Sequence, residues 1–320
     1  MNTQHQQHLR GLVAATYTPF HPNGALNLDA VESQAGNLLK QNLTTAFIGG
    51  STGESHSLSL AERRQLTQRW IEVARSTSLR IVVHVGSNCL EDAKTLAAQA
   101  GQLGALAISA LAPSHFKPST LAVLVEWCAE IAAAAPETPF YFYDIPALTH
   151  TNFSMPTFLA QAGDRIPTLR GIKFTNYDLM AYQLCLEMSG GAFDILWGVD
   201  ESLLGALALG ARGAVGSSYN LAAPVYQRLL LAFERGDLAT ARQEQFRSVQ
   251  LINLLARYGY LGAAKAVMKM LGVDVGPARP PNTNPTPEEA VKLQGELEHL
   301  GFFEWVAAAK PGTAALTPGE

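Results

Sequence analysis

Residues 139–175 read PFYFYDIPALTHTNFSMPTFLAQAGDRIPTLRGIKFT. This stretch begins with the apolar run PFYFYDI, ends with the run LRGIKFT, and carries a helical pattern at 154–163 between them. Continuous apolar runs are typical of parallel strands that are buried on both faces, because a half-exposed strand would alternate apolar and polar residues. The stretch therefore predicts two parallel strands joined by a helix.

The same unit recurs along most of the chain. Six more apolar runs rich in β-branched or aromatic residues begin near Gly11, Ala46, Ile81, Ala105, Asp194 and Arg212. The other helical patterns cover 28–40, 60–74, 91–103, 119–135, 178–189 and 201–210. Eight strands alternating with seven helices predict an α/β fold, the (β/α)8 TIM barrel, and a doubly wound open sheet is the alternative.

One of these helices has clear boundaries in the sequence. Between 60 and 74, the side chains of Leu66, Trp70 and Val73 recur at the spacing of a helix face laid against a sheet. Ser59, with Glu62 three residues later, matches a capping box, which predicts that the helix begins directly after Ser59.

About a hundred residues follow the last predicted strand. Helical patterns lie near 223–235, 237–257, 261–271 and 286–300, and a barrel needs only one of them. The surplus helices must pack on the outside of the barrel or against a neighbouring subunit. Between them, residues 276–287 (GPARPPNTNPTP) contain five prolines and are expected to be extended.

This pattern predicts a division of the chain into four parts. They are a flexible N-terminus (1–10), the barrel (11–235), a C-terminal helical extension (236–304) and a flexible tail (305–320).

Composition excludes several functional classes. Of 320 residues, 48% are hydrophobic and 16% charged, which suits a compact domain with a large core. The net charge is −4 and the 23 Lys and Arg residues are scattered, so nucleic acid is not an expected partner. Residues 1–9 (MNTQHQQHL) lack the features of a secretory signal and no apolar stretch reaches the length of a membrane span, which predicts a cytoplasmic protein.

Cysteine and histidine give no sign of a metal site. The cysteines at 89, 128 and 185 are odd in number and have no CxxC spacing, which argues against a disulfide framework or a zinc ribbon. His84 lies within a strand, whereas His115 and His150 are isolated in loops. No metal is expected, although His150 follows a strand end and could reach a substrate.

Lys173 is the most informative single residue. Barrel enzymes place their functional groups at the C-terminal ends of the strands. In the run 169–175, alternation places Leu169, Gly171, Lys173 and Thr175 on one face and the apolar pair 172 and 174 on the other, which should contact the helices. Lys173 then points into the barrel, where burial favours the free amine that attacks a carbonyl. The alternative is a lysine that pairs with a carboxylate or extends to the rim.

Two further groups should lie near this lysine. Tyr143 is one βα unit earlier, so its strand should be adjacent, and a phenol can relay protons; alternatively it is a core residue of the aromatic run FYFY. The turn GGSTGE (49–54) offers the hydroxyl and N–H groups of Ser51 and Thr52 to an anion such as a carboxylate. It lacks the GxxxxGK[ST] pattern of a phosphate loop, and a simple connector is the alternative.

Paired carboxylates occur at another strand end. Asp200 and Glu201 could accept hydrogen bonds from sugar hydroxyls. They could instead cap a helix and complement its dipole, and the two roles are compatible.

Five motifs in this order resemble the N-acetylneuraminate lyase branch of the dihydrodipicolinate synthase-like aldolases. They are GSTGE, YDIPALT, GIKFTN, WGVDE and GSSYN, and the similarity extends from about Gly11 to Arg279. The resemblance implies that Lys173 forms the Schiff base, that Tyr143 donates and accepts protons, and that Ser51 and Thr52 bind the 2-oxo acid carboxylate. The positions implied to hold the hydroxylated tail of a sialic acid are Thr175, Gly198, Asp200, Glu201 and Ser217.

Departures from relatives bear on the substrate. Dihydrodipicolinate synthases carry a Gly-Arg pair where this chain has Ala147 and Leu148, and leucine cannot bind a carboxylate bidentately. The residue after IPALT, commonly glycine in the lyase branch, is His150, and the loop at 114–116 lacks the paired tyrosines of many relatives. These two changes could alter the preference among sugar acids.

The resemblance therefore implies retro-aldol cleavage of sialic acid to N-acetylmannosamine and pyruvate by a cytoplasmic homotetramer, with no organic cofactor and no metal. Two alternatives remain. One is an aldolase or dehydratase that acts on another 2-oxo sugar acid through the same lysine. The other is a non-catalytic sugar-acid binding protein, which the presence of both Lys173 and Tyr143 disfavours.

Overall fold

The computed structural model describes residues 8–307, whose strands form one closed parallel barrel. Each strand pairs with the next along the chain, and β1 also pairs with β8, which closes the sheet. The prediction of a (β/α)8 barrel is confirmed and the open sheet is excluded. The strands are β1 (Gly11–Ala15), β2 (Thr45–Ile48), β3 (Arg80–His84), β4 (Ala107–Leu111), β5 (Phe140–Asp144), β6 (Leu169–Phe174), β7 (Asp194–Trp197) and β8 (Gly213–Gly216).

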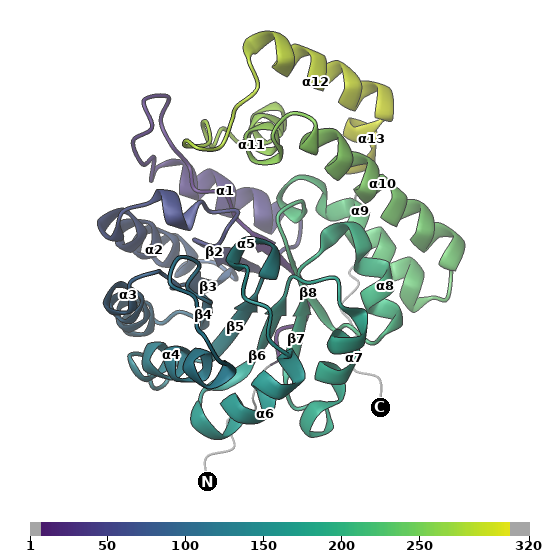
Figure 1. Cartoon of the computed structure of the whole chain (residues 1–320). Coiled ribbons are helices and arrows are strands. Elements are labelled where there is room, and N and C mark those ends of the chain that lie inside the picture. The colour runs from purple at the N-terminus through teal and green to yellow at the C-terminus, as the bar shows by residue number, and fades with distance from the viewer. Residues whose placement is uncertain (1–7, 308–320) are drawn as a thin grey trace.

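Helices surround these strands (Figure 1). They are α1 (Ala30–Lys40), α2 (Leu60–Ala74), α3 (Leu90–Leu103), α4 (Leu121–Ala133), α6 (Met155–Arg165), α7 (Leu179–Glu187), α8 (Leu203–Ala208) and α9 (Tyr219–Glu234). Short helical turns also occur: η1 (Ser55–Ser57), α5 (Pro146–Thr149), η2 (Met188–Gly190) and η3 (Asp200–Ser202). The helices predicted at 178–189 and 201–210 overlap η2 and η3, whereas η1 and α5 were not predicted from the sequence. Segments of three or four residues are too short to show helical periodicity.

The strands separate two hydrophobic cores, one between the sheet and the helices and one inside the barrel. Ile172 and Phe174 of β6 pack in the outer core, as predicted from alternation. Leu169 packs there as well, and its predicted place on the face of Lys173 is wrong. The register between β5 and β6 shifts at Phe140, so that Phe140 pairs with Leu169 but the next residue pairs with Gly171. This irregularity breaks the alternation below Gly171.

The remaining helices form an extension on one side of the barrel (Figure 1). They are α10 (Leu238–Ala256), α11 (Tyr260–Met270), α12 (Pro287–Leu300) and α13 (Phe302–Ala307). Helices α10 and α13 both pack against α9, and the proline-rich segment 276–287 contains no helix until α12 begins at its last residue.

The two predicted flexible ends fall largely outside the described residues, which exclude 1–7 and 308–320. Within the described part, Leu9 is buried in the core of the barrel and Trp305 belongs to α13. Across residues 8–307, no helix combines the length and the apolar character needed to cross a membrane.

Candidate active site

Lys173 projects from β6 into the barrel. It is in register with Tyr143 of β5 and is 4% exposed. Its Nζ lies 4.0 Å from the centroid of the Tyr143 ring and 4.2 Å from that of Phe47, which comes from β2. Lys173 forms no salt bridge with any other residue between 8 and 307. An amine held in this way can attack a carbonyl once it has lost its proton.

Tyr143 connects this lysine to the turn that follows β2. The Tyr143 side chain is buried, and its hydroxyl oxygen lies 3.3 Å from Oγ of Ser51. Edge-on contacts with the rings of Phe47 and His84, at centroid distances of 5.9 and 5.8 Å, fix the orientation of the phenol. The structure therefore places in one row an amine from β6, a phenol from β5 and a serine hydroxyl from the turn after β2.

The turn at 49–54 depends on its glycines. Gly49 has φ of 63°, a conformation that other residues seldom adopt. A Cβ at Gly53 would lie 2.9 Å from the backbone nitrogen of Gly49, so a side chain at 53 would force the turn apart. Ser51 and Thr52 lie between the two glycines and are half-buried. This tight turn brings their hydroxyl groups to the end of the barrel that holds Tyr143.

His84 supports the same turn from β3. Its Nδ1 lies 2.9 Å from the carbonyl oxygen of Gly49 and donates to it, since a carbonyl can only accept. Burial and the nearby Arg63 guanidinium hold the pKa of His84 well below its usual value, which keeps the ring neutral. From the sequence, His84 was predicted only to lie within a strand. Alternation from Val82, which faces the barrel interior, would have shown that His84 also points inward.

Asp200 lies on the opposite side of the barrel mouth, after β7. It is 5% exposed, and its Oδ2 accepts hydrogen bonds from the backbone nitrogen of Ser218 at 2.9 Å and from Oγ of Ser218 at 2.5 Å. Burial raises the pKa of Asp200 to about 6, although the bonds from Ser218 oppose this shift. The carboxylate covers Gly216, where a Cβ would collide with it. Asp200 is not the N-cap of η3, which is Val199, and its carboxylate bonds instead to Ser218, the residue before α9.

Thr175 lies against Gly198, and both Gly198 and Glu201 are within two residues of Asp200 in the chain. Oγ1 of Thr175 is buried and has no hydrogen-bond partner among residues 8–307. A Cβ at Gly198 would collide with this oxygen, so only glycine fits there. Glu201 accepts a hydrogen bond of 3.0 Å from the hydroxyl group of Tyr177. Partial burial and the Glu201 carboxylate raise the pKa of Tyr177.

Ser217 after β8 contacts the C-terminal extension. Its Oγ lies 2.8 Å from the hydroxyl oxygen of Tyr260, the first residue of α11. Its carbonyl oxygen accepts a hydrogen bond of 3.2 Å from Tyr17. Neither Tyr260 nor Tyr177 was predicted from the sequence as a site residue. Tyr260 is 43 residues beyond Ser217, and no local pattern links them.

The two departures from relatives lie in exposed loops. His150 has φ of 51° and is exposed, and Phe116 is 86% exposed. The loop at 114–116 is held by Oδ1 of Asn88, which accepts from the backbone nitrogens of Ser114 and His115. No hydrogen bond or ring contact joins either departure to Lys173 or Tyr143 within residues 8–307.

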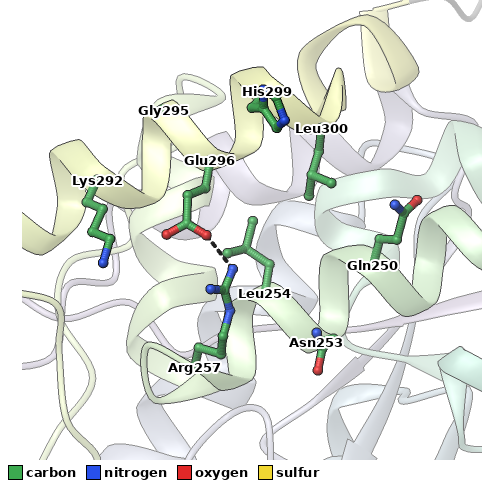
Figure 2. A pocket seen from close by; sticks show the side chains of 9 residues that line it. All are labelled: Gln250, Asn253, Leu254, Arg257, Lys292, Gly295, Glu296, His299 and Leu300. Carbon is green, nitrogen blue, oxygen red and sulfur yellow. Dashed lines mark hydrogen bonds and ion pairs between the residues drawn. The ribbon is translucent and has the colours of Figure 1, made fainter.

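A groove of about 500 Å³ lies elsewhere, between α10 and α12. The ion pair of Arg257 and Glu296 spans it, and its walls belong entirely to the C-terminal extension (Figure 2). None of the predicted site residues lines this groove. Among the described residues, no three His, Cys, Asp or Glu side chains gather as a metal site would require.

Residues 8–300 match the Dihydrodipicolinate synthetase family. The chain belongs to this family. It is 39% identical to the N-acetylneuraminate lyase of Mus musculus over 299 residues, which cover 92% of this chain and 93% of the relative. Identity to N-acetylneuraminate lyase A of Xenopus laevis is 42% over 276 residues, or 85% of this chain and 90% of the relative.

A solved structure of a similar protein superimposes closely. The N-acetylneuraminate lyase of Proteus mirabilis has a TM-score of 0.90 and 36% identity, over 92% of this chain and all of that one. The resemblance found in the five motifs thus extends over the fold.

Proposed function

We propose that this chain is an N-acetylneuraminate lyase, a class I aldolase that cleaves sialic acid to N-acetylmannosamine and pyruvate. The observation that carries the proposal is the row of Lys173, Tyr143 and Ser51, with Nζ of Lys173 4.0 Å from the ring centroid of Tyr143 and the Tyr143 hydroxyl 3.3 Å from Ser51. The names of the relatives and of the superimposed structure support the same substrate.

The row provides the groups that the reaction needs. Ser51 and Thr52 bind the carboxylate of the open-chain sugar acid, and Lys173 attacks C2 to form an iminium with loss of water. Tyr143, or the substrate carboxylate, accepts the proton of the C4 hydroxyl group. The C3–C4 bond then breaks, its electrons pass to the iminium, and N-acetylmannosamine leaves. Protonation of the resulting enamine and hydrolysis release pyruvate and free Lys173. No organic cofactor or metal enters these steps.

The sugar hydroxyls are proposed to bind on the side of β6 to β8. Thr175 supports this because its buried Oγ1 lacks a protein partner among the described residues. The other proposed contacts are Gly198, Asp200, Glu201 and Ser217. Asp200 is already bonded to Ser218, so it would orient this wall as well as accept from the sugar.

Product analysis tests the substrate. Pyruvate and N-acetylmannosamine should appear in equal amounts from N-acetylneuraminate, at a higher kcat/KM than for other 2-oxo sugar acids. Pyruvate released with a different aldehyde, or loss of water without release of pyruvate, would instead identify an aldolase or dehydratase for another sugar acid. Binding without turnover would identify a non-catalytic protein. Leu148, which replaces the arginine of the synthases, opposes a synthase.

We also propose that the enzyme is a cytoplasmic homotetramer. Met180 and Leu184 lie four residues apart on α7 and are more than half exposed, as is Tyr177 just before the helix, so this part of the surface is apolar. Light scattering should give four times the chain mass of 34.3 kDa, and a monomer mass would contradict the assembly.

A further inference from the structure

The turn that carries Ser51 and Thr52 ends at a buried carboxylate, Glu54. The Glu54 side chain is completely buried, and its backbone has φ of 55°, which is unfavourable for a residue with a Cβ. Glu54 belongs to none of the proposed steps at Lys173. A buried charge on a strained residue needs an explanation of its own, because both features cost stability.

Both oxygens of Glu54 bond to the C-terminal extension. Oε1 accepts from Nζ of Lys265 in α11 at 2.9 Å, and Oε2 accepts from the backbone nitrogen of Arg279 at 2.7 Å. Nζ of Lys265 also donates to the carbonyl oxygen of Pro277 at 2.7 Å. Lys265 is itself 1% exposed, so the pair is removed from solvent. Two segments more than 200 residues later in the chain are thus fixed to the turn.

The Arg279 side chain adds further bonds between the proline-rich segment and the residues around the turn. It donates to the carbonyl oxygens of Gly24 and Ser57 and to both oxygens of Glu62. Ser57 is the last residue of η1, which follows the turn directly. Residues before, within and after the turn are therefore bonded to one proline-rich segment, which prolines make stiff.

These bonds fix the position of the turn more than they stabilise the fold. The desolvation of a buried ion pair offsets much of its attraction, so such a pair is weak support for stability and better suited to fixing one arrangement. Recognition of a carboxylate by Ser51 and Thr52 needs their hydroxyl groups placed to within about 0.5 Å. Glu54 is two residues beyond Thr52, so a shift of its carboxylate moves these hydroxyls.

We propose that Glu54, Lys265 and Arg279, the Glu54 anchor, position the turn for the 2-oxo acid carboxylate, so that the C-terminal extension sets substrate affinity without contacting the substrate. The inference rests on the proposed function at Lys173 and deepens it. The three members are positioning residues, since none touches the reacting atoms.

Two carbonyl probes separate positioning from general loosening. Pyruvate and acetone can both form an iminium with Lys173 that borohydride reduces, but only pyruvate has a carboxylate. In Glu54→Gln, labelling of Lys173 by pyruvate should slow about tenfold at a given low concentration, whereas labelling by acetone should be unchanged. Equal slowing with both probes, or no slowing with either, would overturn the anchor.

The matched control is Glu244→Gln. Glu244 of α10 is also a buried carboxylate with two basic partners, Arg228 and Arg247, but it does not contact the turn. Neither probe should respond to this substitution. If Glu54→Gln does not fold, Glu54→Asp keeps the charge and shortens the tether, and the same separation of the two probes is expected.

Calorimetric titration with pyruvate tests the anchor at equilibrium, without trapping by borohydride. Pyruvate should bind more weakly to Glu54→Gln than to the wild type and equally well to Glu244→Gln, and unchanged binding in both variants would contradict the anchor. Absence of any labelling in the wild type would overturn the proposed role of Lys173 instead.

Discussion

At the residue scale, Lys173 and Tyr143 form the centre of the site. Alternation along β6 and the spacing of one βα unit predicted that these residues lie on adjacent strands and point inward. The flanking Phe47 ring and the bond from Tyr143 to Ser51 could not be predicted, because they join residues about 90 or more positions apart. Separation in sequence also hid Tyr260, which is 43 residues beyond Ser217, and the partners of Glu54, which are more than 200 residues beyond it.

Tyr143→Phe tests the phenol as a proton relay. The substitution keeps the ring that contacts Lys173 and removes only the hydroxyl group. Since positioned proton transfer contributes about 10²–10⁴-fold to a rate, kcat for cleavage should fall by that factor while the circular dichroism spectrum stays unchanged. A loss of less than tenfold would show that another group carries the proton.

Asp200→Asn tests the buried carboxyl group. Its pKa is raised to about 6, so it stabilises the fold when protonated, fully below its unfolded value of about 4, and this contribution is lost as the pH rises through 6. Asparagine does not titrate. Between pH 4 and pH 7.5, the free energy of unfolding of the variant should therefore rise relative to wild type, by on the order of 3 kcal/mol.

Urea unfolding at the two pH values measures this difference. The same difference at both, or a change of the opposite sign, would show that Asp200 is ionised without cost in the folded protein.

At the scale of the element, most helices could be located from the sequence to within a few residues. Apolar periodicity and capping residues are local, and α2 begins after Ser59 as the capping box predicted. The short α5 and α13 lack enough turns to show a period. The register shift beside Leu169 depends on how β5 and β6 pair, which a single strand does not encode.

Ser59→Ala tests the start of α2. Oγ of Ser59 accepts from the backbone nitrogen of Glu62 at 3.2 Å, and Thr286 makes the equivalent bond at the start of α12. Each alanine substitution should lower the free energy of unfolding by about 1 kcal/mol and leave kcat unchanged. Thr286→Ala is the matched comparison, because it removes the same kind of capping bond from a helix of the extension. Denaturant unfolding would disprove the capping argument if either loss were negligible or above about 3 kcal/mol.

At the scale of the whole molecule, the barrel was predictable and the place of the extension was not. Eight buried apolar runs alternating with helical patterns allow few other folds. The contacts of the extension with the barrel mouth include those of Tyr260 with Ser217 and of Lys265 with Glu54. These contacts make the C-terminal helices part of the proposed site rather than an outer layer.

The most direct test of the account is reduction with borohydride in the presence of pyruvate, followed by peptide mass mapping. We expect one reduced pyruvyl adduct, on Lys173, and none in Lys173→Ala, whose circular dichroism spectrum should match that of the wild type. An unmodified Lys173 in the wild-type protein, or an adduct on a different lysine, would contradict the proposed Schiff-base chemistry.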